Sequence, residues 1–183
     1  MGRRSSCFTP SETATASSTS TDLKTKAPTS SSTWPSTSVA RVSYTVTTDV
    51  SPQVVWDALT EFGPRRAQLW PDLSPSSFKV LERGETWARV REGTAGLGIW
   101  SIERYEWKEP VITATVEEAN AAQTGGTWRM EVRPRTGGGS VLTINMDRRA
   151  KGIVGHLIHG LFQITNGHFL AGRTRRMLSN LRG

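Results

Sequence analysis

The sequence has one cysteine, three histidines and no long apolar run, and each shortage excludes a class of protein. Because Cys7 is alone, neither an intramolecular disulfide nor a cysteine-ligated zinc site can form. No apolar run approaches the roughly 18 residues that a membrane-spanning helix needs. All three histidines lie between His156 and His168, which confines any histidine-rich metal site to that segment. The chain has 183 residues, of which 36% are hydrophobic, so it is long enough for one ordinary domain with a core.

Several catalytic motifs are also missing from the sequence. It contains no G-x-S-x-G, no H-E-x-x-H and no G-x-x-x-x-G-K-[ST]. The run Gly137-Gly138-Gly139 is not a phosphate loop, because a strand pattern follows it where such a loop needs a helix. These absences disfavour hydrolase, kinase and zinc-protease chemistry. We expect neither a metal ion nor a cofactor.

Charge is distributed unevenly along the chain. The net charge is +7, yet residues 39–147 hold 12 basic and 14 acidic residues, whereas residues 148–183 hold seven basic and no acidic ones. Nucleic-acid modules usually spread basic groups over a whole face, so we expect no nucleic-acid partner. The pattern favours a solvated helix face that complements the helix C-terminal dipole. A contact with phosphate, anionic lipid or an acidic partner is the alternative.

The first 38 residues differ in composition from the rest. They include 20 Ser or Thr and few apolar residues, so ordering them would cost more entropy than burial could offset. We predict a disordered tail over 1–38 and one domain over 39–183. The opening Met1–Ser6 fits a loose myristoylation pattern, with Cys7 as a second lipid site. A plain flexible leader and a misassigned start upstream of Val39 are the alternatives.

From Val39 onward the residue pattern predicts alternating secondary structure. Apolar and polar residues alternate over 42–47, which indicates a half-buried strand. Ser51 and Pro52 are typical of a helix start, and a short helical turn follows over 65–69. Six further segments with turn residues between them predict an antiparallel meander. These strands are expected over 78–82, 87–91, 99–107, 111–118, 127–133 and 141–147.

The C-terminal segment 153–181 lacks proline and is apolar at helical spacing, which predicts a long helix with a bend near Asn166-Gly167. Its apolar stripe is expected to pack on the dry face of the sheet. We assign to that stripe Val154, Leu157, Ile158, Leu161, Thr165 and Phe169. We expect the opposite, exposed side to carry His156, His159, Gly160 and Gln163.

The text VSPQVVWDALTEF over residues 50–62 resembles the opening of the START-like (SRPBCC) superfamily. More narrowly, it is similar to the polyketide cyclase/dehydrase and lipid-transport group, and the resemblance extends over 39–181. It implies an α+β helix-grip fold, in which a curved antiparallel sheet of about seven strands wraps around a long C-terminal helix. Two short helices would follow the first strand, and a cavity would lie between the sheet and the long helix.

Three side chains are candidates for catalysis. His168 falls in the apolar stripe by angle and could orient a ligand or act as acid and base, although a hydrogen-bonded core histidine is the alternative. Glu118 shares a strand face with apolar residues, and we expect it opposite Trp100. Arg104 is expected opposite Ala114. Glu118 and Arg104 could meet the polar atoms of a ligand at a pocket end, or lie at a wet rim.

Large flat and apolar side chains supply the predicted ligand-binding surface. The candidates are Trp100, Ile102, Tyr105, Trp128, Met130 and Leu161. The glycine-rich segment Thr94–Gly98 is a candidate pocket lip, and an ordinary hairpin turn is equally consistent with it. We interpret His156 and His159 as surface histidines, with metal ligation as the alternative.

Together these patterns predict a cytoplasmic protein that binds a hydrophobic small molecule, either a lipid or a polyketide-like compound, between sheet and helix. An aromatic polyketide cyclase or dehydratase is a second hypothesis. A protein-interaction module that uses the basic C-terminal helix is a third. The sequence does not identify the ligand or the oligomeric state.

Overall fold

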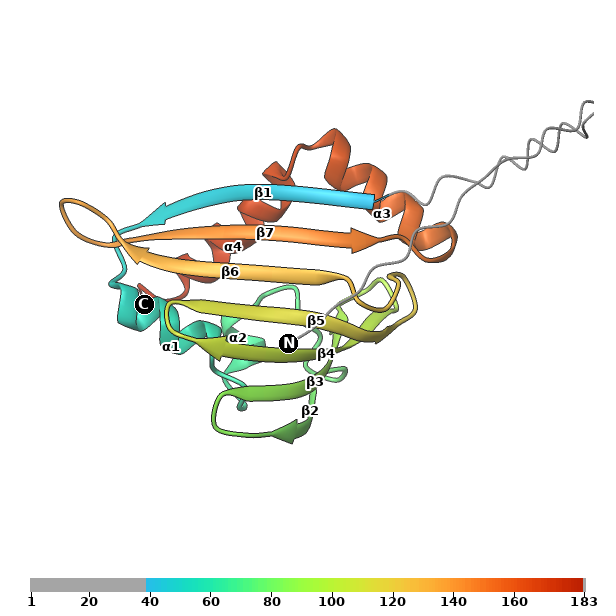
Figure 1. The fold of residues 1–183 in the computed structure, drawn as a ribbon, viewed down its shortest axis with the longest axis horizontal. Helices are drawn as coiled ribbons and strands as arrows, with labels where there is room; N and C mark the ends of the chain where they lie inside the picture. The colour runs from blue at the N-terminus through green and yellow to red at the C-terminus, as the bar shows by residue number, and fades with distance from the viewer. Residues whose placement is uncertain (1–38, 183) are drawn as a thin grey trace, which may run out of the picture. The chain divides into compact units, whose positions relative to one another are not determined.

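The computed structural model describes residues 39–182, and the tail predicted over 1–38 lies outside them. Seven strands and four helices follow one another in the described part (Figure 1). In chain order they are β1 (Val39–Thr48), α1 (Pro52–Leu59), α2 (Arg66–Leu69), β2 (Lys79–Arg83), β3 (Trp87–Thr94), β4 (Ile99–Lys108), β5 (Val111–Ala119), β6 (Thr127–Pro134), β7 (Ser140–Arg149), α3 (Gly152–Ile164) and α4 (His168–Ser179).

The strands form one antiparallel sheet in the order β1-β7-β6-β5-β4-β3-β2. Strands β2 to β7 are therefore a meander, and the first strand joins the sheet beside the last, as Figure 1 shows. Two short helices connect β1 to β2, and two helices follow β7. This curved sheet with helices packed on it is the helix-grip fold that the sequence predicts.

Helix α1 covers the sheet beside β6 and β7. Pro52 occupies its first turn, where the missing N–H costs nothing, and Ser51 precedes it with extended backbone and no side-chain cap. Val55 and Leu59 are fully buried, and Phe62 extends the same buried cluster just past the helix end. The helix therefore stays in place through its apolar face rather than through its cap.

The C-terminal helix is divided in two, which confirms the predicted bend. Asn166 and Gly167 both have left-handed backbone, with φ of 44° and 78°. A Cβ atom on Gly167 would come within 2.7 Å of Cγ1 of Val42, so only glycine permits this approach of helix to strand. The second half, α4, supplies the core residues Met177 and Leu178.

The predicted orientation of the first half, α3, is wrong. Its apolar stripe faces solvent, since Leu157 is 70% exposed, whereas the buried residues are Gly155 and His159. The physical reason is local packing: a Cβ atom on Gly155 would lie 2.2 Å from the carbonyl oxygen of Ala121. The face of α3 that carries Gly155 therefore packs against the segment at Ala121. His159 lies on that face and is buried, so the prediction that it is exposed is wrong. His156 is exposed, as expected.

The predicted register of β4 and β5 is also wrong by one residue. The turn contains two residues, Glu109 and Pro110, so Arg104 lies opposite Thr115. A bulge near the far end then places Glu118 opposite Ile102. Because side chains alternate between the faces of a strand, this slip exchanges the face on which a β4 residue lies.

Candidate functional site

Charged residues occupy inward positions at one end of the sheet. On β3 the buried Ala88 and Val90 are followed, with the same period of two, by Glu92. On β4, Glu103 and Tyr105 are inward neighbours, exposed by only 3% and 4%. Buried charges are costly unless they are paired, so their partners identify a polar site within an apolar core.

Arg66 and Glu92 form the first ion pair, with 2.7 Å between Nε and Oε1. The guanidinium is 4.2 Å from the ring centroid of Phe62 and also donates 3.1 Å to the carbonyl oxygen of Glu61. The hydroxyl of Tyr105 donates to the other carboxylate oxygen of Glu92 at 3.0 Å. This carboxylate is therefore held on both oxygens, and α2 is fastened to β3 and β4.

Arg148 and Glu103 form the second ion pair. One guanidinium nitrogen of Arg148 donates to both carboxylate oxygens, at 2.8 and 2.9 Å, and the hydroxyl of Ser101 donates to the same carboxylate at 2.7 Å. Arg148 is the second-last residue of β7 and Glu103 belongs to β4, with β6 and β5 between those strands. The contact therefore crosses the inner face, which requires a curved sheet, because three flat strand spacings would separate the strands by about 14 Å.

Burial and charge fix the protonation states in this site. Burial raises the pKa of Tyr105 well above its ordinary value of 10.0, and the nearby carboxylates of Glu92 and Glu103 raise it further. For Arg66 burial acts to lower the pKa, but the charge of Glu92 and its hydrogen bond hold the pKa above the ordinary value. At neutral pH Tyr105 is therefore a neutral hydrogen-bond donor and Arg66 a cation.

Three buried N–H donors have no acceptor among the described residues 39–182. They are Nε1 of Trp70, Nε1 of Trp128 and Nε of Arg148. The guanidinium carbon of Arg148 lies 5.5 Å from the ring centroid of Trp128, so two of the three donors are close together. A buried unpaired donor is costly, and an oxygen atom of a bound molecule would satisfy it.

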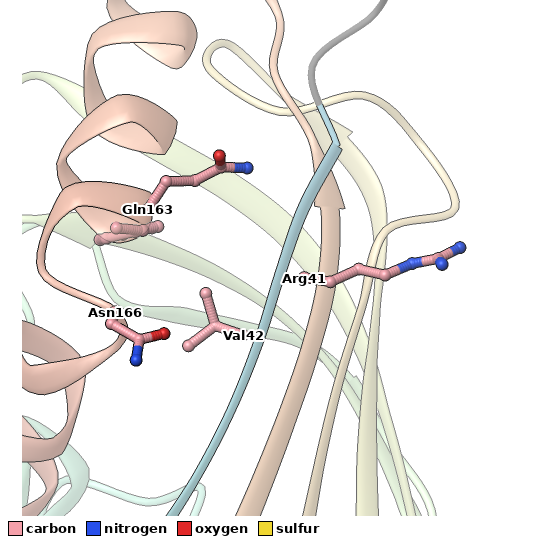
Figure 2. A pocket seen from close by; sticks show the side chains of 5 residues that line it. Arg41, Val42, Gln163 and Asn166 are labelled. Carbon is pink, nitrogen blue, oxygen red and sulfur yellow. The ribbon is translucent and has the colours of Figure 1, made fainter.

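A hollow of about 530 Å³ opens between β1 and α3, within the volume range typical of small-molecule sites. It is lined by Arg41, Val42, Phe162, Gln163 and Asn166. Figure 2 shows Val42 directed from β1 into the hollow, while Arg41 points to the other side of the strand. A second hollow of about 370 Å³ shares both of these residues but lies on the outer face of the sheet, because most of its lining, such as Ser43, Arg129 and Asn145, alternates with the inward residues of β1, β6 and β7.

An apolar row connects the first hollow to the unpaired donors. Val42 pairs with Met146 on β7, and Met146 pairs with Trp128 on β6. Residues paired in this way lie on the same face of the sheet. Arg148 follows two residues after Met146 and therefore lies on that face too, about 7 Å along the strand. Of this row only Val42 lines the hollow, and the buried Met146 separates it from Trp128 and Arg148 on the same face.

The structure does not bring the three predicted catalytic residues together. His168 is exposed at the start of α4, so the expectation that it faces the cavity is wrong. Arg104 lies on the outer face, 4.2 Å from the ring centroid of Trp87 and paired with Glu106. Glu118 is exposed near the end of β5. A shared catalytic role for these three stays an untested prediction.

The predicted ligand-binding residues divide between the two faces. Tyr105 and Met130 are buried in the core, and Trp128 lies on the same inner face. Trp100 and Ile102 alternate with the inward residues of β4 and therefore lie outside, where Arg91 stacks over Trp100. Leu161 is 44% exposed on α3, because that helix turns its apolar stripe outward. The segment Thr94–Gly98 is an exposed hairpin turn, and its role as a lip is untested.

The sequence analysis missed the four charged members of the site, which are Arg66, Glu92, Glu103 and Arg148. For the three strand residues a signal was present, because each stands at an inward position of its strand's alternating pattern. Arg66 carried no comparable signal, since α2 has only four residues and no clear face. Within residues 39–182 no group of three or more His, Cys, Asp or Glu lies close enough to hold a metal ion. In the same residues, no helix combines the length and apolar character needed to cross a bilayer.

The site and the fold together describe a helix-grip protein with an opening beside its C-terminal helices. Residues 39–182 match the model of the family described as polyketide cyclase / dehydrase and lipid transport. The chain belongs to this family, which confirms the resemblance noted in the sequence. No curated protein matches the chain significantly.

Solved structures share the fold at low sequence identity. The Zhui aromatase/cyclase from Streptomyces sp. R1128 superposes with a TM-score of 0.65 at 16% identity, over 79% of this chain and 94% of that one. A START superfamily protein from Mycobacterium smegmatis gives 0.57 at 18% identity, over 75% and 98%. Norcoclaurine synthase from Thalictrum flavum, in complex with dopamine and hydroxybenzaldehyde, gives 0.57 at 14% identity, over 78% and 86%. Such identities establish a common fold and leave activity open.

Proposed function

We propose that this protein binds an apolar small molecule with an oxygen-bearing end, which enters through the hollow between β1 and α3. The observation that carries the proposal is the pair of unpaired donors, Nε1 of Trp128 and Nε of Arg148, at the inner end of an apolar row. The apolar part of the molecule would lie along Val42 and Met146. Its oxygen would accept from the two donors.

The class of ligand is inferred from the charged and N–H groups that the site contains. The charged residues of the site are already paired, Arg66 with Glu92 and Arg148 with Glu103, so a second net charge would find no free counterion. A carbonyl or hydroxyl group needs only N–H donors, and one such hydrogen bond in a dry site contributes about 1 kcal/mol. Lipid-like and polyketide-like molecules carry such groups on an apolar frame, in agreement with the family description.

A direct test uses two fluorescent polyene probes with the same chain, one ending in a methyl ester and the other a plain hydrocarbon. We expect saturable binding of both. Trp128→Phe should weaken binding of the ester about fivefold and leave binding of the hydrocarbon unchanged, because it removes one N–H donor. Gln163→Trp, which narrows the hollow, should weaken both probes.

Trp87→Phe is the matched control, since Trp87 lies on the outer face under Arg104. It should bind both probes like the unaltered protein. The proposal fails if the unaltered protein shows no saturable binding, or if Trp128→Phe and Trp87→Phe affect binding of the ester equally.

Aromatic cyclisation of a polyketide is the second candidate function. It is favoured by the hydrogen bond from Tyr105 to Glu92 on the inner face, which is a path for proton transfer, and by the likeness in fold to an aromatase/cyclase. With a poly-β-keto thioester as substrate, Tyr105→Phe should abolish turnover while probe affinity stays within about twofold. Tyr44→Phe is the control. Replacement of His168, Arg104 and Glu118 together tests the assignment made from the sequence, and unchanged product formation rejects it.

A further inference from the structure

Helix α3 presents its apolar side to solvent, which reverses the usual arrangement of a surface helix. At 100° per residue its exposed aliphatic residues fall within an arc about 100° wide. They are Ile153 (82% exposed), Val154 (51%), Leu157 (70%), Leu161 (44%) and Ile164 (86%). The helix carries no charged residue on any side. Exposed apolar surface of this extent on a regular element marks a contact site for something outside the described domain.

Packing beneath the helix fixes this outward orientation. Gly155 lies so close to Ala121 that an added Cβ would be 2.2 Å from its carbonyl oxygen, and the N–H of Lys151 donates 3.0 Å to that same oxygen. His159 is buried beside Phe162 on the same inner side, with ring centroids 6.3 Å apart. Rotation of α3 to bury its aliphatic stripe would therefore expose or displace each of these contacts.

The charge near α3 distinguishes between two possible partners for its apolar stripe, a second copy of the chain and a lipid surface. Residues 148–183 contain seven basic and no acidic residues, and two of them, Arg149 and Lys151, are exposed and directly precede α3. A second copy docked through the same helix would bring two such segments together, and like charges repel. A surface of anionic lipid carries the opposite charge and is attracted.

The area of the apolar stripe also favours a lipid surface over a second protein chain. A 13-residue helix is about 20 Å long, so one face offers only a few hundred Å², whereas a standard protein interface needs about 800 Å² from each partner. An interfacial helix needs no such area from a matched partner, because its apolar side chains enter the boundary between headgroups and acyl chains. Five exposed aliphatic side chains with basic neighbours meet that requirement.

We propose that α3 docks this protein reversibly on an anionic lipid surface, with its aliphatic stripe inserted and its basic neighbours at the headgroups. The helix also forms one wall of the hollow through Phe162 and Gln163, so docking would place the opening beside the lipid. Only this last link rests on the proposed ligand site. The docking itself depends on α3 and the basic residues.

Cosedimentation of the full chain with lipid vesicles tests the docking. We expect binding to vesicles of phosphatidylcholine mixed with phosphatidylserine, weaker binding at high salt, and little binding to phosphatidylcholine alone. Serine at three stripe positions, Ile153→Ser, Leu157→Ser and Ile164→Ser together, should reduce partition to the mixed vesicles by about tenfold or more. Exposed positions tolerate such changes, which an unchanged urea midpoint would verify.

Val54→Ser is the matched control, because Val54 is 42% exposed on α1, which begins beside Ser140 at the start of β7, whereas α3 follows the end of that strand. It should bind vesicles like the unaltered chain. Three outcomes overturn the proposal: no binding of the unaltered chain to anionic vesicles, equal binding by the triple variant, or an unaltered chain that is a dimer which the triple substitution dissociates. Failure here leaves the probe-binding result unaffected, so the two proposals are separable.

Discussion

A single buried arginine organises the polar end of the core. Arg66 is only 3% exposed, and its guanidinium lies between the ring of Phe62 and the carboxylate of Glu92. Arg66→Met would leave that carboxylate without its countercharge, so we expect a loss of about 3 kcal/mol in the free energy of unfolding. Urea denaturation measures it.

Two further variants make this test specific. Arg66→Met combined with Glu92→Gln should recover part of the loss, because the uncompensated charge is gone while Tyr105 keeps an acceptor. Arg41→Met breaks an ion pair whose arginine side chain is 80% exposed, and it should cost less than about 1 kcal/mol. Equal costs for Arg66→Met and Arg41→Met would contradict the role assigned to Arg66.

Tyr105 gives the same environment a spectroscopic signature. Its pKa is raised first by burial and then by Glu92 and Glu103, and that of Tyr44, the other tyrosine, is raised mainly by burial. A folded-state pKa above the unfolded value of 10.0 contributes stability that is present below pH 10 and is lost as pH rises through the folded pKa. In Tyr44→Phe, the ultraviolet absorbance of tyrosinate should therefore appear only well above pH 10 while the protein stays folded. If Tyr105 instead ionised near pH 10 in the folded protein, its side chain would be exposed to solvent and the assigned burial would be wrong.

Residue-scale chemistry could be predicted from the sequence only in part. Trp128 and Met130 were identified because their alternating strand has a clear dry face, whereas Tyr105 was chosen only as a large flat side chain. Arg148 and Glu103 were not, since a charge on a dry face is recognised as a site only when its partner is known. That partner stands 45 residues away and three strands across the sheet. Such pairing depends on curvature, which local sequence does not encode.

Two glycines of the C-terminal segment, Gly167 at the N-cap of α4 and Gly172 within it, should respond in opposite ways to substitution by alanine. Gly167 has φ of 78° and touches Val42, so Gly167→Ala should lower the free energy of unfolding by about 2 kcal/mol. Gly172 lies within the helix with open space at its Cβ position, so Gly172→Ala should raise that free energy by about 0.5–1 kcal/mol. Thermal or urea unfolding of both variants measures this. Changes of the same sign would refute the hinge assigned to Gly167.

Element types were predictable, whereas two orientations were not. Period-two alternation identified the strands, and the helix break at Asn166-Gly167 was visible because the apolar positions after Gly167 rotate onto another helical face. The face on which α3 packs is decided by Gly155 against Ala121, a contact between segments that the helical pattern does not reveal. The β4–β5 register depends on one turn residue and one bulge, and a single-residue error there exchanges the two faces.

For the whole molecule, the family and the order of elements follow from residues 39–182 alone. The opening segment over 50–62 identified the fold through its resemblance to the START-like superfamily, and its residues Val55, Leu59 and Phe62 are buried in the structure. The meander and the final helices then leave few alternative topologies, since antiparallel neighbours with short turns pair in chain order. Function is less constrained, because it depends on which side chains line the hollow.

The boundary at residue 38 is testable through stability of the whole chain. Because 20 of the first 38 residues are Ser or Thr and few are apolar, ordering them on the domain would cost more than their burial returns. A variant that starts at Pro35, four residues before β1, should therefore keep its free energy of unfolding within about 0.5 kcal/mol of the full chain. Urea denaturation of both chains under identical conditions measures the difference. A loss above about 2 kcal/mol would mean that the segment contributes to the folded core and that the predicted domain boundary is wrong.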